Sequence, residues 1–220
     1  MRKLFVFALG VLFLSLASLA SAYTINDAVG DRIGGWKFEI YGIDISNDGT
    51  NSFFDIYTNY PIHQTFTVGT WKTFAGDLAL STTDDYDWSY GVAFTDHDGF
   101  TKGTIYNNAT WNISNDYEPA GGNYIYNENH FVTLKNGSVF GTGSVTWTQI
   151  DTLGAPNGPD YKVTVTIPKL DGYTPDFQHT HWASATCAND FVGAPEPVAS
   201  ILFLTGGSVL LARRLRRVKK

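Results

Sequence analysis

Oxygen-bearing side chains recur near residue 50 with the spacing of a calcium-binding loop. Asp44, Ser46 and Asp48 stand at its first, third and fifth positions, Gly49 at the sixth and Asp55 at the twelfth. An EF-hand takes calcium ligands and its sharp turn from these positions. Strand-like segments flank this loop, however, and its last ligand position carries Asp in place of the longer Glu. We therefore favour a β-hairpin turn and keep calcium as a minor hypothesis.

A second acidic concentration follows on two loops that bracket a strand pair. Carboxylates at this density repel one another unless they are solvated or bound to a metal ion. Solvated loops are the simpler reading, and a calcium ion is the alternative. The residues are Asp84, Asp85, Asp87, Asp96 and Asp98.

His179 and His181 are two residues apart, so a strand would present both imidazoles on one face. That spacing suits a metal pair, but zinc needs further ligands that the sequence does not place. The other histidines, His63, His97 and His130, are scattered. Structural or surface histidines are the favoured interpretation.

Cys187 is the one cysteine, so no disulfide can form within the chain. A nucleophilic thiol needs exposure and a basic partner, for which His179 or His181 would be available. We favour a small buried hydrophobe and keep an intermolecular disulfide as the alternative.

Four tryptophans are candidates for a sugar-binding face, because aromatic rings stack on pyranose faces while neighbouring amides bind hydroxyl groups. The same rings fill the cores of β-sandwiches, and the two interpretations stay open for this set. The residues are Trp71, Trp88, Trp111 and Trp147. No strand carries the alternating pair of carboxylates that a glycosidase of this architecture needs, so we predict that the protein is not an enzyme.

Alternating patterns separated by Gly, Asn and Asp turns predict an all-β body of about ten short strands. We expect a single antiparallel β-sandwich, jelly-roll-like, over residues 23–193, with a closed barrel as the alternative. An irregularity is expected at Gly42 and turns at Asp96–Gly99 and Asn136–Gly137. The expected strands are Trp36–Ile45, Phe53–Tyr60, Phe66–Val68, Asp77–Ser81, Ser89–Thr95, Gly103–Tyr106, Tyr124–Tyr126, Val139–Ile150, Tyr161–Ile167 and His179–Thr186.

The body is strongly acidic, although the chain as a whole carries a formal charge of −6. Eight of the 15 Lys and Arg residues lie in the two terminal segments, whereas 20 of the 21 Asp and Glu residues lie in the body, which leaves it near −13. Such a surface repels phosphate backbones, so we exclude nucleic-acid binding.

The N-terminus has the three parts of a secretory signal. Arg2 and Lys3 form a positive start, Leu4–Leu16 is almost wholly apolar, and Ala20 and Ala22 supply a small-x-small cleavage motif for signal peptidase. We expect residues 1–22 to be removed, because the apolar run is short for a retained anchor.

The C-terminus combines a short apolar segment with a basic tail. An uncharged stretch at 198–212 follows Pro195–Pro197, and residues 213–220 carry six basic side chains, which the positive-inside rule holds in the cytoplasm. We therefore expect a transmembrane helix at 198–212, with arginines reaching the head groups and the body outside. A plain tail anchor is the alternative.

This three-part end, about the last 26 residues, resembles the PEP-CTERM sorting signal of Gram-negative bacteria that carry an exosortase. The resemblance implies a membrane-embedded protease that cuts near the triplet in residues 194–220 and passes the chain to the cell surface or extracellular matrix. The matching residues are Pro195, Glu196 and Pro197, with Gly206-Gly207 in the apolar stretch and the cluster Arg213, Arg214, Arg216 and Arg217.

The body is similar to exosortase-dependent surface proteins of unknown molecular role. The resemblance implies a location and no reaction. It rests on the order of five motifs, which are Gly30–Gly35, Phe38–Asp44, Ile56–Tyr60, Gly76–Leu78, and His181-Trp182 with Cys187–Asp190.

We therefore expect an exported protein that an exosortase processes, held in the membrane transiently and then at the cell surface or in the biofilm matrix, without enzymatic activity and in association with exopolysaccharide. A carbohydrate- or calcium-binding module is the second hypothesis, and a secreted hydrolase the third.

Overall fold

Strict alternation of side chains explains the two central strands of the first sheet. In Asn51–Thr58 every second residue is buried, and Tyr161–Pro168 repeats this pattern. Successive residues of a strand point to opposite faces, so each of these strands turns one row of side chains toward the core. The buried row of Tyr161–Pro168 is apolar, whereas that of Asn51–Thr58 holds Phe54 and Ile56 between two polar residues. They lie side by side, with Phe54 opposite Val165 and Ile56 opposite Val163.

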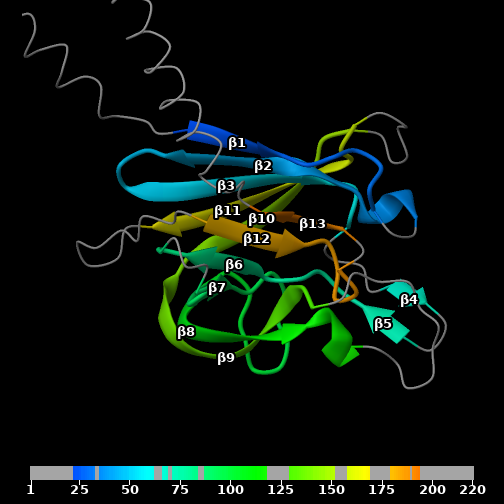
Figure 1. The fold of residues 1–220 in the computed structure, drawn as a ribbon. Coiled ribbons are helices and arrows are strands. Elements are labelled where there is room, and N and C mark those ends of the chain that lie inside the picture. The colour runs from blue at the N-terminus through cyan, green and yellow to red at the C-terminus, as the bar shows by residue number, and fades with distance from the viewer. Residues whose placement is uncertain are drawn as a thin grey trace, which may run out of the picture.

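Two antiparallel sheets pack into a β-sandwich in this computed structural model, as the sequence predicted (Figure 1). The structure describes residues 22–32, 35–61, 66–68, 71–83, 87–117, 129–151, 158–168, 179–188 and 190–193. The expected strand Tyr124–Tyr126, residues 1–21 of the predicted signal peptide 1–22, and the sorting signal at 194–220 lie outside these ranges. No helix in the described part has the length and apolar character that a membrane crossing requires.

The two sheets differ in size, and a small ribbon accompanies them. The five-stranded sheet has the order β1 (Ala22–Asn26), β2 (Ile40–Asn47), β3 (Asn51–Thr58), β11 (Tyr161–Pro168), β10 (Ser144–Gln149). The six-stranded sheet has the order β13 (Phe191–Gly193), β12 (His179–Ala183), β6 (Leu78–Ser81), β7 (Tyr90–Val92), β8 (Thr104–Ile113), β9 (Phe131–Thr142). The ribbon pairs β4 (Phe66–Val68) with β5 (Trp71–Thr73), and short 3₁₀ turns form at Trp36–Phe38 and Ser114–Tyr117.

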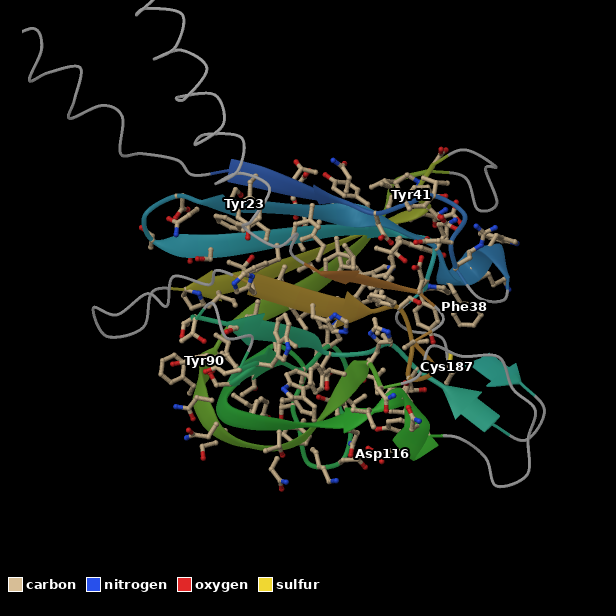
Figure 2. All side chains as sticks on the ribbon, viewed as in Figure 1. Tyr23, Phe38, Tyr41, Tyr90, Asp116 and Cys187 are labelled. Atoms are coloured by element: carbon tan, nitrogen blue, oxygen red, sulfur yellow. The ribbon has the colours of Figure 1, made fainter. Side chains whose placement is uncertain are left out.

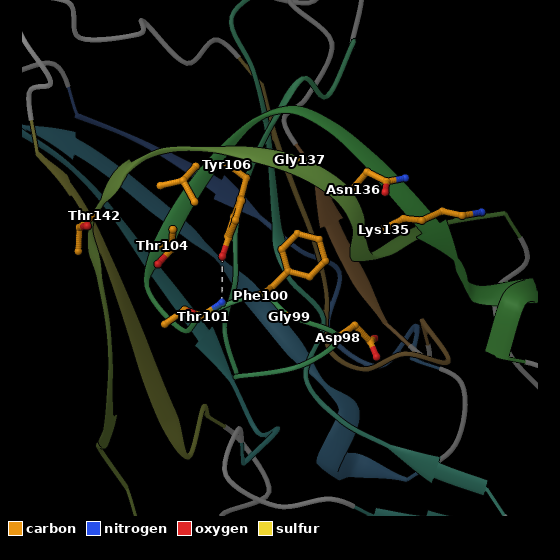
Figure 3. A pocket seen from close by; sticks show the side chains of 11 residues that line it. Asp98, Gly99, Phe100, Thr101, Thr104, Tyr106, Lys135, Asn136, Gly137 and Thr142 are labelled. Atoms are coloured by element: carbon orange, nitrogen blue, oxygen red, sulfur yellow. Dashed lines mark hydrogen bonds between the residues drawn. The ribbon is translucent and has the colours of Figure 1, made fainter.

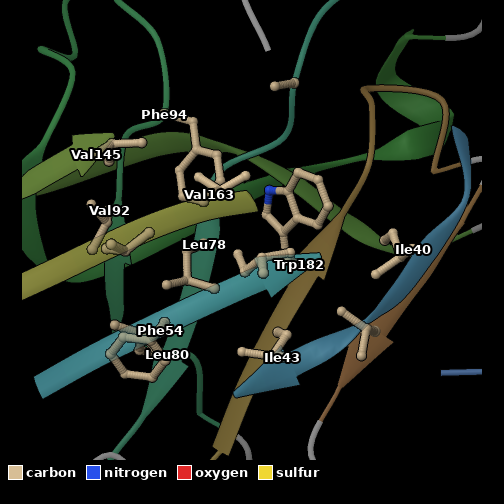
Figure 4. Packing of buried hydrophobic residues seen from close by; sticks show 14 of the residues in the cluster. Ile40, Ile43, Phe54, Leu78, Leu80, Val92, Phe94, Val145, Val163 and Trp182 are labelled. Carbon is tan, nitrogen blue, oxygen red and sulfur yellow. The ribbon is translucent and has the colours of Figure 1, made fainter. Parts of the chain in front are cut away.

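The main core lies between the sheets and is aromatic at its centre (Figure 4). Trp182 of β12 is fully buried, stacks on Phe94 with ring centroids 5.7 Å apart, and donates its indole N–H to the Gly76 carbonyl at 3.0 Å. Phe54 and Val163 contribute side chains from the opposite sheet. Burial of a side chain of this size contributes about 1.5–3 kcal/mol.

The connectivity differs from the jelly-roll pattern that the sequence suggested. A jelly roll is built from two Greek keys, whose long connections separate consecutive strands. Here β1 to β3 form one meander and β6 to β9 another, so most neighbours in each sheet are consecutive in sequence. The jelly-roll part of the prediction is therefore wrong. Alternation reports which residues face a core, and it does not report the order of the strands.

Several predicted boundaries also move. Trp36–Phe38 forms a 3₁₀ turn, so the strand expected from Trp36 begins at Ile40. The irregularity expected at Gly42 is confirmed as a register shift, where φ is +144° and a Cβ atom would lie 2.3 Å from the Ile25 carbonyl oxygen. The Asn136–Gly137 turn is wrong, because both residues lie inside β9. The strand expected at Val139–Ile150 is two strands divided at Gly143.

The β8–β9 hairpin curls over the outer face of its own sheet (Figure 1). Its register shifts at four points, and bulges of this kind bend a strand and increase its twist. Leu134 of β9 packs with Ala93 and Tyr106 in a second cluster, and Val132 packs with Ala183 and Ala188 in a third. Every residue of β6 and β12 is consequently buried on both faces.

A buried carboxylate ties this curled layer together. Asp77, 1% exposed, stands just before β6 and accepts hydrogen bonds from the backbone N–H groups of Phe94 at 2.9 Å and Leu134 at 2.8 Å. Its Oδ2 also lies 2.8 Å from His97 Nε2. One side chain thus joins β6, the β7–β8 loop and β9.

Asp77→Ala would leave two buried N–H groups and an imidazole without their acceptor. We expect it to lower the free energy of unfolding by about 3–5 kcal/mol, measured by urea denaturation. Asp116→Ala is the matched control, since exposed Asp116 accepts one bond from a described residue, the Ile113 N–H, and it should cost about 1 kcal/mol. Equal losses in the two variants would contradict the role given to Asp77.

Candidate functional site

An open groove lies between the β7–β8 loop and the curled hairpin (Figure 3). Its volume is about 540 Å³. Phe100, Tyr106 and Val139 supply its apolar atoms. The polar side chains that line it are Asp98, Thr101, Thr104, Lys135, Asn136 and Thr142.

A tight turn shapes one wall of the groove. His97 and Phe100 exchange backbone hydrogen bonds of 3.2 and 2.6 Å, and the two residues between them have positive φ angles, +44° at Asp98 and +89° at Gly99. A two-residue turn with both φ angles positive favours Asp-Gly, the dipeptide found here. The Thr101 N–H donates to the Tyr106 hydroxyl at 2.9 Å, which fixes the turn against β8 (Figure 3).

His97 anchors the same turn to the protein interior. Its Nε2 contacts Asp77 at 2.8 Å and its Nδ1 lies 3.5 Å from Asp98. Burial alone would lower the pKa of His97, but the hydrogen bonds and charges of Asp77 and Asp98 outweigh it and raise that pKa. The positive charge of the ring is therefore favoured next to the two carboxylates.

Aromatic contacts give the groove a rigid apolar wall. Phe100 meets Tyr106 edge to face with centroids 4.9 Å apart and lies 5.4 Å from the His97 ring. Val139, which is 71% exposed, adds an aliphatic surface on β9. Rings and methyl groups beside hydroxyl and amide groups can bind an amphipathic ligand.

A second site forms where the first and last described segments meet. Single carboxylate oxygens of Asp27, Asp31 and Asp190 all lie within 4.8 Å of one another. Asp190 is buried, and its two oxygens accept the backbone N–H groups of Ile40 at 2.7 Å and Phe191 at 2.9 Å. We call these three aspartates the acidic cluster.

The acidic cluster binds protons unusually tightly. Burial, and then the charge of Asp31, raises the pKa of Asp27 to about 7. Burial, and then the charges of Asp27 and Asp31, raises the pKa of Asp190 to about 8, although its hydrogen bond from the Ile40 N–H acts in the opposite direction. A divalent cation held by the three carboxylates would relieve the same repulsion.

Residues Asp44 to Asp55 form the β2–β3 hairpin, with Asp44 directly opposite Asp55. Asp48 lies in the turn, where its Oδ1 accepts the N–H groups of Thr50 and Asn51. Ser46 pairs with Phe53 farther along the ladder. Among the described residues, the acidic cluster is the group of three or more acidic, His or Cys side chains whose ligand atoms lie within 4.8 Å of one another, and Asp44, Asp48 and Asp55 do not form such a group.

Asp44 and Asp55 face each other as like charges, and their neighbours compensate for this. Asp55 accepts hydrogen bonds from Lys162 at 3.2 Å and Thr164 at 2.5 Å, and Asp44 accepts one from Thr24 at 2.6 Å. Like charges directly opposite one another weaken a sheet unless such partners are present.

The remaining acidic loops separate into different environments. Asp87 accepts a hydrogen bond from the Ser81 hydroxyl at 2.8 Å, and Asp96 accepts the Lys102 N–H at 2.8 Å. Asp98 lies in the groove turn, as the sequence predicted for Asp96–Gly99. Asp84 and Asp85 lie outside the described residues.

The histidine pair and the cysteine are both buried. His179 and His181 are 3% and 8% exposed, and burial, followed by the nearby His130, lowers the pKa of His181 to about 4. Cys187, 4% exposed, lies inside the fold near Thr73, with 3.7 Å between sulfur and hydroxyl oxygen (Figure 2). The interpretation of Cys187 as a buried hydrophobe is confirmed. His63 lies outside the described residues.

The structure brings together two of the four candidate tryptophans. Trp111 donates its indole N–H to the Trp88 carbonyl at 2.9 Å, and both rings contact Phe131. Trp147 packs against Tyr161 on the other sheet. The side chain of Trp71 lies outside the described residues.

The sequence did not single out the groove or the acidic cluster as sites. Lys135 precedes the turn expected at Asn136–Gly137 and Asn136 begins it, so no pattern linked them to Asp98. A signal did exist for the cluster, since Asp31 and Asp190 belong to motifs that carry the family resemblance. Only their closeness in space was missing.

A scan against protein-family models and searches of curated proteins and of solved structures found no match to this chain.

The raised pKa values make the acidic cluster a source of pH dependence. Because the pKa values of Asp27 and Asp190 in the folded chain exceed the unfolded value of 3.8, the stabilisation they provide is complete below that value. It is lost progressively as the pH rises from 3.8 to about 7 to 8. We expect Asp27→Asn, which stays neutral, to flatten the fall of the urea midpoint over that range.

The control for this experiment is Asp116→Asn, which removes an exposed carboxylate outside the acidic cluster. It should keep the pH dependence of the unchanged chain. The raised pKa of His97 gives the same pH dependence in the unchanged chain and in both variants. The difference in pH dependence between these proteins therefore comes from the acidic cluster. If Asp27→Asn leaves the pH dependence of the urea midpoint unchanged, the acidic cluster is not its source.

Proposed function

We propose that this chain is an exported, non-enzymatic surface or matrix protein, cut by an exosortase at Pro195–Pro197 and retained outside in association with exopolysaccharide. The observation that carries the proposal is the position of the described strands in the chain. The described strands run from Ala22 to Gly193, which is the interval between the predicted signal-peptidase site and the predicted sorting signal.

Removal of either signal would leave the sandwich intact. A cut after Ala22 removes one residue from β1. The remaining four residues, Tyr23 to Asn26, keep their pairing with β2. The last strand, β13, ends at Gly193, two residues before Pro195. Prolines cannot extend a helix upward from the membrane, so the triplet would remain an open backbone for a protease.

The absence of an enzymatic role is part of this proposal. In the acidic cluster both oxygens of Asp190 accept backbone N–H groups, which gives this carboxylate a structural task. The secreted hydrolase of the third hypothesis would need a carboxylate pair with access to substrate, and Asp190 is 3% exposed.

The test of sorting is the intact mass and cell fraction of the protein from its native cells. We expect a mature form that starts at Tyr23, ends near the triplet and is found on the surface or in the medium. The triple variant Pro195→Ala, Glu196→Ala, Pro197→Ala should keep its C-terminus and stay in the membrane. An intact C-terminus in both proteins would refute sorting and leave a tail-anchored β-domain.

A second candidate function is calcium binding, favoured by the acidic cluster. Calcium binds carboxylate and carbonyl oxygens, and occupation would stabilise the folded chain by mass action. We expect millimolar CaCl₂ to raise the melting temperature, and more strongly at pH 8 than at pH 6, because the ion must displace the protons of Asp27 and Asp190.

Asp31→Asn is the variant that tests the calcium candidate, because Asp31 is exposed and its loss should not disturb the core. It should abolish the calcium-dependent rise, whereas Asp116→Asn should keep it. If the melting temperature is the same in CaCl₂ and in EDTA, the calcium candidate is wrong.

A further inference from the structure

We propose that the groove between the 97–100 turn and the β8–β9 hairpin is a binding site for a neutral saccharide. This inference deepens the proposed association with polysaccharide and rests on it for its biological setting. Its physical basis is separate, since it comes from the groove alone. A volume of about 540 Å³ falls within the range of about 300–1,000 Å³ typical of small-ligand sites.

Polar groups in the groove have hydrogen-bonding capacity to spare. The hydroxyls of Thr101, Thr104 and Thr142 and the ammonium of Lys135 make no hydrogen bond with another described residue. Asn136 uses its amide nitrogen on Thr110 at 3.1 Å, which leaves its carbonyl oxygen as an acceptor. Hydroxyls, an amide and an ammonium together match a ligand whose groups both donate and accept hydrogen bonds.

Apolar atoms stand among these polar groups. Figure 3 shows the Phe100 ring between Tyr106 on one side and Lys135 and Asn136 on the other. The partly exposed Phe100 ring and the 71% exposed Val139 offer surfaces to the C–H face of a pyranose. A sugar ring carries C–H groups and hydroxyl groups. The groove offers apolar surfaces for the first and hydrogen-bonding groups for the second.

Charge selects against anionic ligands. The groove is lined by one cation, Lys135, and one anion, Asp98, so its lining has no net charge. The body around it is near −13. A polyanion would be repelled by this field, whereas a neutral saccharide is indifferent to it and can still bind the two charged groups as donor and acceptor.

Hydrogen bonds fix the turn that forms one wall of the groove. His97 anchors the turn to buried Asp77, the Thr101 N–H anchors it to Tyr106, and the Lys102 N–H to Asp96 at 2.8 Å. Preorganisation matters for saccharides, because the free energy lost on ordering a site is subtracted from a weak affinity.

The test is isothermal titration calorimetry of the purified full chain in detergent. Neutral hexasaccharides of glucose, galactose and mannose are the probes, and a hyaluronan hexasaccharide is the anionic comparison. We expect saturable binding of at least one neutral probe and none of hyaluronan. The double variant Lys135→Ala, Thr142→Ala should bind about tenfold more weakly, the loss expected for one or two hydrogen bonds.

Two matched pairs separate the groove from the rest of the surface. Val139→Ser should weaken binding, whereas Val29→Ser, at an equally exposed valine outside the groove, should not. Thr148→Ala, on exposed β10, is the corresponding control for the loss of Thr142. All of these positions are exposed, so the variants should keep their melting temperatures.

Three outcomes would overturn the inference, namely no binding of any neutral probe, binding that the groove variants leave unchanged, and preferential binding of hyaluronan. Each can be distinguished from a failure of the proposed function. A chain that is cut and exported but binds no saccharide would refute only the groove. A chain that binds saccharide but keeps its C-terminus would refute only the sorting.

Discussion

Asp77 is a carboxylic side chain that is only 1% exposed, and three residues from separate parts of the chain supply its hydrogen bonds. Phe94 and Leu134 donate backbone N–H groups, and His97 supplies an imidazole. A buried carboxylate is costly unless each partner is in place. The curled layer of β8 and β9 can therefore cover β6 only in the arrangement that satisfies Asp77, and the groove follows from that arrangement.

The groove and the core are both connected to the Gly76-Asp77 segment. The Asp77 carboxylate contacts His97, and His97 begins the turn that forms one wall of the groove. On the other side of the sheet Trp182 donates to the carbonyl of Gly76, the neighbour of Asp77. The segments Gly76–Leu78 and His181-Trp182, which lie far apart in the sequence, therefore meet in space.

The acidic cluster makes a similar connection between the ends of the body. Asp190 joins the segment before β13 to the start of β2, and Asp27 and Asp31 follow β1. The strands nearest the two predicted cleavage sites are therefore held by one group of carboxylates whose charge depends on pH. If the chain is cut as proposed, these contacts remain within the body, because Asp27, Asp31 and Asp190 all lie between the two predicted cleavage sites.

Local patterns in the sequence were enough to determine the all-β class, the irregularity at Gly42 and the turn at Asp96–Gly99, because alternation and turn residues act over a few positions. The predicted terminal signals are of the same local kind. The sequence did not determine the order of the strands, the place of Asn136 inside β9 or the approach of Asp190 to Asp27. Such pairings join residues far apart in the chain, and their free energy depends on which surfaces meet in the folded core. Only the tertiary structure could decide them.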